Sequence, residues 1–238
     1  MKILFLRHGA TAGNEMRRYI GRTDEPLSPQ GIRQAEAAGK IPVLSLVYVT
    51  PLLRTRQTAE IMFPNARQVT VEDLREMDFG DFEGKNAQEM ESDRLYRDWV
   101  DGNCMGQCPG GESRDAFADR VQTAFERTVI FHMSSGMDST AVLETDSRIG
   151  SITVLETNSR IGSEAVVATD SRMDILVFVV HGGTIMAVLE KFARPTMTFY
   201  EGHVGNCQGF LCTLSSPAAG DEFPFVLTEI TKIDKVIL

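Results

Sequence analysis

Short apolar runs alternate with helix-prone, amphipathic stretches along most of this chain. The clearest apolar runs have the length of buried strands and lie at 3–6, 43–49 and 175–180. Weaker strand candidates lie at 69–71, 205–214 and 224–231. Helix-prone stretches separate them, at 32–39, 86–100, 115–133 and 183–192. This alternation predicts an α/β fold, a three-layer α/β/α sandwich with a mainly parallel central sheet.

Two of the apolar runs end in the same way. The run at 3–6 is followed by Arg7, His8 and Gly9, and the run at 175–180 is followed by His181, Gly182 and Gly183. Open α/β sheets bind ligands at the carboxyl ends of their strands, so we expect both histidines at one edge of the sheet. A histidine in such a place is more often structural, but two of the chain's four occupy it, and Arg7 adds a cation suited to phosphate or carboxylate. The pattern favours an anion site.

Helix signals support the same organisation. Ser28 followed by Pro29 is typical of a helix start. The run at 43–49 leads into TPLLRTRQTA, which places Arg54 and Arg56 in the first turns of another helix. Cations oppose the helix dipole there and are tolerated where an anion binds, but a solvated arginine pair is an equal alternative at this point. The glycine- and arginine-rich stretch 12–25 is expected to be a loop able to cover a ligand, and the turn at 109–113 could present backbone N–H groups to an anion.

The predicted helix over 115–133 is amphipathic. Its expected inner face consists of Phe117, Val121, Phe125, Val129 and His132.

An internal repeat lies between the predicted helix at 115–133 and the apolar run at 175–180. Residues 139–150, 151–162 and 163–174 are three consecutive copies of a twelve-residue unit, and the first two match at nine positions. Each copy has a β-prone half and a turn-prone half, which favours three antiparallel strands. We interpret 139–174 as an insertion in a single domain that spans 1–238. Exposed strand edges invite pairing, so a homodimer is one expectation and an idle loop is the alternative.

Composition narrows the function classes. A net charge of −9 argues against a nucleic-acid partner held by bulk electrostatics, so an anionic substrate needs a local pocket of arginines. No apolar stretch has the length of a membrane span, and the N-terminus lacks the pattern of a signal peptide, so a cytoplasmic location without membrane partners is expected. The four cysteines have spacings that favour reduced thiols over a zinc site.

Six motifs in order give the chain a resemblance to a known family. They are LRHGAT (6–11), GRTDEPLSPQGIRQA (21–35), TPLLRTRQTA (50–59), LREMDFGDFEG (74–84), PGGES (109–113) and VVHGGTI (179–185). Together they resemble the histidine phosphatase superfamily, also called the phosphoglycerate mutase-like family, over nearly the whole chain outside 139–174. One departure is Ala10, where the family often has Glu. The other is the repeat, which precedes the strand that bears His181.

The resemblance implies roles for individual residues. His8 would be the nucleophile that takes the phosphoryl group, with Arg7, Arg54 and His181 lining the phosphate site. Glu76 would be the general acid that protonates the leaving oxygen and later activates water. The substrate-binding residues would be Arg7, Thr11, Asn14, Arg22, Arg54 and Gly182. A neutral imidazole attacks phosphorus when an acceptor holds its other nitrogen, and converging cations stabilise the charge of the transition state.

The expected substrate is a small phosphate ester, with no cofactor and no metal. Within the family, HGG and PGGES look more like the phosphatases than the mutases, which tend to carry HGN, and most like the α-ribazole-5′-phosphate phosphatases. The sequence therefore predicts a metal-independent phosphomonoester hydrolase acting through a phosphohistidine, on α-ribazole 5′-phosphate or sugar phosphates. A phosphoglycerate mutase and a catalytically silent phospho-ligand binding module are the alternatives.

Overall fold

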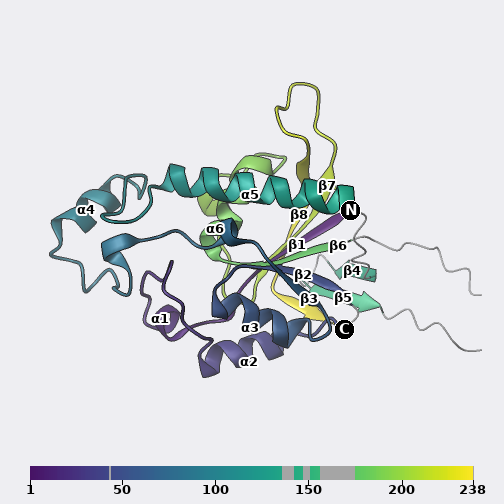
Figure 1. The fold of residues 1–238 in the computed structure, drawn as a ribbon, viewed down its shortest axis with the longest axis horizontal. Helices are drawn as coiled ribbons and strands as arrows, with labels where there is room; N and C mark the ends of the chain where they lie inside the picture. Colours follow the sequence, from purple (N-terminus) through teal and green to yellow (C-terminus); the bar gives the residue numbers. More distant parts are fainter. Residues whose placement is uncertain (43, 136–141, 147–150, 156–174, 238) are drawn as a thin grey trace, which may run out of the picture.

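The centre of the protein is a six-stranded sheet with the strand order β3-β2-β6-β1-β7-β8 (Figure 1). The computed structural model describes residues 1–42, 44–135, 142–146, 151–155 and 175–237. Strands β3, β2, β6 and β1 run parallel, whereas β7 is antiparallel to β1 and β8 to β7. The predicted α/β fold with a mainly parallel sheet is confirmed. The strand bounds are β1 Lys2–Arg7, β2 Leu46–Val49, β3 Arg67–Thr70, β6 Ile175–Val180, β7 Gly209–Ser215 and β8 Val226–Ile233.

Helices cover both faces of this sheet and complete three layers (Figure 1). One face carries α2 (Pro29–Ala38) and α3 (Leu53–Met62), and the other carries α5 (Arg114–Ser135) and α6 (Gly182–Phe192). Alternation along β1 explains the arrangement, because successive side chains of a strand point to opposite faces. Ile3 and Phe5 belong to the core under α5 and α6, while Leu4 and Leu6 pack with residues of α2 and α3.

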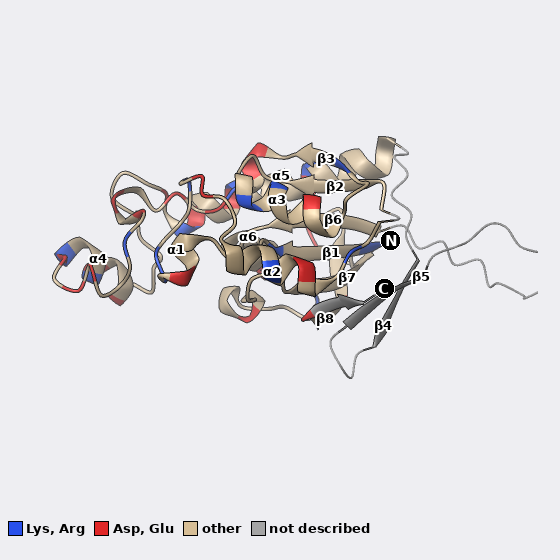
Figure 2. Ribbon diagram, turned by 90° about the horizontal axis from the view of Figure 1, so that it is seen from below, with Lys and Arg blue, Asp and Glu red and all other residues tan. Residues whose placement is uncertain are grey.

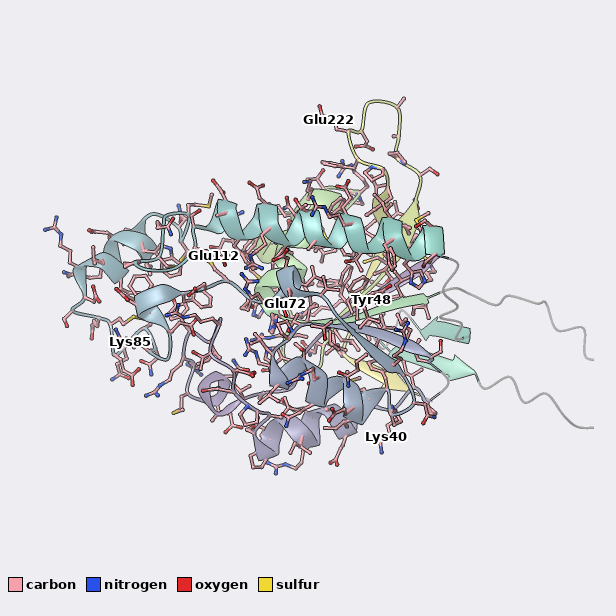
Figure 3. The ribbon with its side chains drawn as sticks, viewed as in Figure 1. Lys40, Tyr48, Glu72, Lys85, Glu112 and Glu222 are labelled. Atoms are coloured by element: carbon pink, nitrogen blue, oxygen red, sulfur yellow. The ribbon has the colours of Figure 1, made fainter. Side chains whose placement is uncertain are left out.

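The inner face predicted for the long helix is confirmed. Phe117, Val121, Phe125, Val129 and His132 are all buried on α5. His132 is accommodated because its Nδ1 lies 3.0 Å from the hydroxyl of Tyr48, a residue of β2 labelled in Figure 3. This buried pair ties the end of α5 to the sheet.

Helix boundaries follow the capping residues more closely than the apolar pattern. Ser28 caps α2 as predicted, accepting a hydrogen bond from the Gly31 amide. The helix predicted over 86–100 is wrong in its first half: α4 spans Arg94–Asp101, because the Asp93 carboxylate accepts from two amides there and starts the helix. The expected loop at 12–25 contains a short helix, α1 (Ala12–Glu15). Short 3₁₀ helices occupy Glu72–Leu74, Gly80–Phe82 and Phe199–Gly202.

One described segment from each of the first two copies forms a strand, and the two strands pair antiparallel as predicted: β4 is Val142–Asp146 and β5 is Ser151–Leu155. The third strand of this small sheet is not a repeat copy. It is β9 (Lys235–Ile237), which runs parallel to β5 and which no sequence pattern predicted. The third copy, 163–174, lies outside the described residues. That 139–174 is an insertion in one domain stays a prediction.

Charged residues lie mainly on the helices and on the loops around α1 and α4, while the central strands carry few (Figure 2). Within the described part of the chain, no helix combines the length and apolar character that crossing a bilayer requires.

Candidate active site

The two histidines that follow apolar strands meet at one edge of the sheet. Strands β1 and β6 are parallel neighbours with Arg7 opposite Val180, so the next residue of each is a histidine. The His8 amide donates to the Val180 carbonyl at 3.0 Å, and the ring centroids of His8 and His181 lie 5.1 Å apart. Only 3% of His8 and none of His181 is exposed. The predicted meeting of the two histidines is confirmed.

His8 is held in one tautomer. Its Nδ1 lies 2.7 Å from the Gly9 carbonyl oxygen, which can only accept, so Nδ1 carries the proton and Nε2 keeps a free electron pair. Burial lowers the pKa of His8 well below its ordinary value, and the charges of Arg54 and Arg7 lower it further. The side chain of Asn206 fixes the backbone by donating to the His8 carbonyl at 2.9 Å. His8 is therefore a neutral, oriented imidazole.

His181 is oriented by a hydroxyl. Its Nε2 lies 2.9 Å from Oγ1 of Thr50, the residue after β2, and its Nδ1 is buried without a partner. When the Thr50 hydroxyl donates to Nε2, Nδ1 carries the proton and is free to donate to a ligand. Burial lowers the pKa of His181, and Arg54 and His8 lower it further. Thr50 lies in a recognised motif but was not predicted as a site residue; its place at a strand end was the available signal.

Arg54 is buried and Arg7 is partly buried, and backbone carbonyls hold both side chains. Arg7 donates through Nη1 to the Val204 carbonyl at 2.8 Å. Arg54, with no exposed surface, donates to the carbonyls of Thr23 at 2.8 Å and Gly21 at 2.7 Å. Burial lowers the pKa of both guanidinium groups, and the negative charge of Glu76 opposes this. For Arg54 the solvated alternative is therefore wrong.

Glu83 shapes the loop that holds Arg54. Its carboxylate accepts hydrogen bonds from the amides of Gly21 at 3.0 Å and Arg22 at 2.9 Å, and from the Thr23 hydroxyl at 2.7 Å. A Cβ on Gly21 would overlap the Met77 carbonyl, so only glycine allows the two segments this close. Glu83 lies in the motif at 74–84, where nothing in the composition distinguished it from the neighbouring carboxylates.

Three buried nitrogens without a hydrogen-bond partner belong to residues of this site. Among the described residues, five buried side-chain nitrogens lack a hydrogen-bond partner, and three of them are Arg7 Nε, Arg54 Nε and His181 Nδ1. A buried donor without a partner costs free energy of folding, which a bound acceptor would recover. The N-terminus of α6 adds a second feature that favours anions. We call His8, His181, Arg7 and Arg54 the polar cluster. Its free donors and charge suit a phosphoryl group.

Glu76 lies against the start of α6. Its Oε2 accepts from the Gly183 amide at 2.9 Å, and its Oε1 accepts from its neighbour's amide, that of Met77, at 3.0 Å. A Cβ on Gly183 would overlap Oε1 of Glu76, so glycine at this position lets the carboxylate lie on the helix N-terminus. Gly183 was not predicted as a site residue. The Cβ of an alanine at Gly182 would make only an ordinary contact, 3.5 Å from Arg7 Cζ.

A partly buried ion pair supports the segment that bears Glu76. Glu112, labelled in Figure 3, receives two hydrogen bonds of 2.8 Å from the guanidinium of Arg120. Arg120 also donates to the Asp73 carbonyl at 2.8 Å, and Glu112 accepts from the Asp78 amide at 2.9 Å. The expectation that the turn at 109–113 binds an anion is not supported at Gly111, because its amide donates to the Cys108 carbonyl at 2.9 Å. The turn positions Glu76 instead.

The remaining predicted residues form the rim and its support. Thr11 is buried and caps α1 through a reciprocal pair of hydrogen bonds with Asn14. The side-chain nitrogen of Asn206, Nδ2, lies 3.4 Å from Asn14 Oδ1 and also donates to the His8 carbonyl, so Asn206 connects Asn14 to the His8 backbone. Arg22 is exposed, with its Nη1 3.4 Å from Asp78 Oδ2. Thr11 and Asn14 therefore act on the loop geometry in this structure, and Arg22 stands at the surface.

A cavity of about 300 Å³ opens beside Glu76 and Gly183.

Within the described ranges, no group of three or more His, Cys, Asp or Glu side chains is placed to hold a metal ion.

Known proteins share both the motifs and the fold. The probable phosphoglycerate mutase GpmB of Escherichia coli O1:K1 / APEC is 34% identical over 133 residues, which is 53% of this chain and 62% of that protein. The crystal structure of a putative α-ribazole-5′-P phosphatase from Escherichia coli K-12 MG1655 matches with a TM-score of 0.67 at 18% identity, covering 100% of this chain and 98% of the other. A phosphoglycerate mutase from Thermus thermophilus matches with a TM-score of 0.56 at 24% identity, covering 97% and 98%.

The match to GpmB thus covers less than two thirds of that relative's length. The profile of the family described as "Histidine phosphatase superfamily (branch 1)" matches residues 3–137, from the first strand to the end of α5. The family match and the names of the structural neighbours, a phosphatase and a mutase, support the prediction of an enzyme. With both histidines at adjacent strand ends and this match over more than half of its length, the chain belongs to the histidine phosphatase superfamily.

Proposed function

We propose that the protein is a phosphomonoester hydrolase that works through a phosphohistidine on His8. The observation that carries the proposal is the polar cluster, in which a neutral imidazole with a free Nε2 lies beside three unpartnered buried donors. Those donors suit the equatorial oxygens of a phosphoryl group in transfer, where negative charge accumulates.

The remaining steps need a proton donor. When Nε2 of His8 attacks phosphorus, the P–N bond forms as the ester P–O bond breaks, and the departing alkoxide takes a proton from the Glu76 carboxyl group. Glu76, now a carboxylate, then takes a proton from water as the water oxygen attacks phosphorus, and the P–N bond breaks. Phosphate leaves and His8 returns to its neutral state. Glu76 is suited to this role because it borders both the polar cluster and the cavity.

The named substrates are α-ribazole 5′-phosphate and sugar phosphates, supported by the HGG and PGGES motifs and by the phosphatase named among the structural neighbours. The GpmB resemblance favours a second candidate, a phosphoglycerate mutase. The two differ in the fate of the phosphoryl group, which water accepts in a hydrolase and a second substrate hydroxyl accepts in a mutase.

The test is phosphate release from α-ribazole 5′-phosphate, sugar phosphates and 3-phosphoglycerate, with a chelator present. We expect release by the native protein and loss of it in His8→Ala. The matched control is His203→Ala, which removes an exposed histidine and should keep activity. Isomerised phosphoglycerate without phosphate release, in the presence of bisphosphoglycerate, would establish the mutase. Inactivity on every substrate together with tight phosphate binding would establish a binding module.

A further inference from the structure

Six aromatic side chains line the cavity that opens beside Glu76. They come from five separate segments of the chain, and they are Tyr19, Phe79, Trp99, Phe117, Phe199 and Tyr200. We call this cavity the aromatic pocket. Glu76 and Gly183 belong to the lining, and Glu76 also interacts electrostatically with Arg7, so a group attached to a phosphate ester held by the polar cluster would extend into the pocket.

The pocket walls support one another. The ring centroid of Tyr19 lies 5.1 Å from that of Phe79 and 5.8 Å from that of Trp99, which are ordinary distances for interacting aromatic pairs. Tyr19 lies in the loop after α1, Phe79 in the segment after Glu76 and Trp99 on α4. Contacts between rings from such distant segments favour a preformed pocket.

Polar atoms of the aromatic residues are already engaged. The Tyr19 hydroxyl lies 3.0 Å from that of Tyr96, and the Trp99 indole N–H donates to the Gly106 carbonyl at 3.1 Å. The Tyr200 hydroxyl donates to the Asn103 carbonyl at 3.3 Å. These side chains therefore offer a ligand their ring surfaces and not their hydrogen-bonding groups.

The positively charged side chain in the lining, Arg114, is already paired within the protein. Arg114 donates to the Glu190 carboxylate at 2.5 Å, and its guanidinium carbon lies 4.3 Å from the centroid of the Phe199 ring. A carboxylate that entered the pocket would lose its water, meet the charge of Glu76 and compete with Glu190 for Arg114. Compact anionic substrates such as phosphoglycerate are a poor match for such a lining.

We propose that the aromatic pocket selects phosphate monoesters whose alcohol part carries a flat, uncharged aromatic or heteroaromatic ring. The proposal rests on the proposed hydrolase function and specifies its substrate class. A volume of about 300 Å³ is at the small end for small-molecule sites and suits a group of one or two rings. α-Ribazole phosphate is one member of this class.

The test compares kcat/KM for n-propyl, 3-phenylpropyl and 3-cyclohexylpropyl phosphate. All three release a primary alcohol, so the chemical step is matched and only the occupant of the pocket changes. We expect 3-phenylpropyl phosphate to exceed n-propyl phosphate by about tenfold or more, and 3-cyclohexylpropyl phosphate by several-fold less than that. Phe199→Ala, or Tyr200→Ala if that variant does not fold, should reduce the ratio of the phenylpropyl to the propyl value.

The control Phe131→Ala removes an exposed ring on α5 outside the pocket and should leave the ratio unchanged. Equal values for phenylpropyl and propyl phosphate, or for phenylpropyl and cyclohexylpropyl phosphate, would overturn the ring proposal and leave the hydrolase standing. A ratio unmoved by the pocket variants would also overturn it. Failure of the native protein to release phosphate from any of the three esters would overturn this proposal, and it would overturn the hydrolase as well if α-ribazole 5′-phosphate and sugar phosphates were also left intact.

Discussion

The polar cluster and the aromatic pocket both border Glu76 but differ in the hydrogen bonding of their polar atoms. In the polar cluster, Arg7, Arg54 and His181 each keep a buried nitrogen without a partner. In the aromatic pocket, Tyr19, Trp99 and Tyr200 direct their polar atoms to protein partners. Since buried polar groups are almost always paired, three unpaired nitrogens in one cluster favour a bound anion there, and the paired polar atoms of the pocket leave an apolar surface. One end suits the phosphoryl group and the other suits the group attached to it.

The largest effect is expected from changing the donor geometry of the polar cluster. Arg54→Lys keeps the charge but loses the planar guanidinium that donates both to the loop carbonyls and to the ligand. We expect kcat/KM for any phosphate ester to fall by roughly 10²–10³-fold, with no change in the preference for an aromatic ring. The control is Arg56→Lys on the same helix, which should stay near the native value. A preference that changed with Arg54→Lys would contradict the separation of the two regions.

The neutral histidines should make stability depend on pH. His8 and His181 have folded-state pKa values below the unfolded value of about 6.5, so the unfolded chain binds more protons as pH falls below 6.5. Stability is fully present above this pH and should fall below it by up to about 1.4 kcal/mol per pH unit for each histidine. Urea unfolding between pH 5 and 7 measures this slope. His8→Gln should remove about half of it, and a native protein with a flat profile would contradict the neutral assignment.

The next effect concerns Glu76, where the two regions meet. Gly183→Ala should push the carboxylate away from the helix start and reduce kcat by about tenfold or more, since general acids contribute roughly 10²–10⁴-fold. The loss should be smaller with p-nitrophenyl phosphate, whose leaving group needs no proton. Gly182→Ala should cost less, because its added Cβ would only touch Arg7. Equal losses with both kinds of leaving group would argue against Glu76 as the proton donor.

The smallest expected effect comes from the ion pair behind Glu76. Glu112→Gln should weaken both hydrogen bonds from Arg120, lowering kcat several-fold and the free energy of unfolding by about 1–3 kcal/mol. Asp98→Asn, which breaks the exposed pair with Arg94, is the control and should change stability by less than about 1 kcal/mol. Kinetics with alkyl and p-nitrophenyl esters, beside urea unfolding, separates positioning from bulk stability: a kcat loss of the same size for both would indicate a purely structural role.

Much of the polar cluster could be predicted because it depends on strand ends. Each histidine follows a continuous apolar run, and parallel neighbours place equivalent residues together, so a local pattern was sufficient for His8 and His181. Arg54 is different. Its burial depends on carbonyls of the loop at 20–23, which lies far from α3 in the sequence, and the residues alone left a solvated alternative open.

The residues that sequence reasoning missed act through long-range contacts. Thr50, Asn206 and Glu83 each orient a site residue or its loop, and each does so across 62 residues or more of sequence. The aromatic pocket was not predicted either, because its rings come from separate segments and share no spacing. Similarly, β9 pairs with a strand of the repeat across a long stretch of the chain, and no local pattern indicates such pairing.

Trapping the phosphorylated protein during turnover tests the central claim most directly. The protein is mixed with a slowly hydrolysed ester, quenched at alkaline pH and digested, and the phosphorylated peptide is identified by mass spectrometry. We predict one acid-labile phosphoryl group on His8, formed and lost at rates compatible with turnover, and absent from His8→Ala. Turnover without any phosphoryl-protein, or with the group on a residue other than His8, would contradict the account.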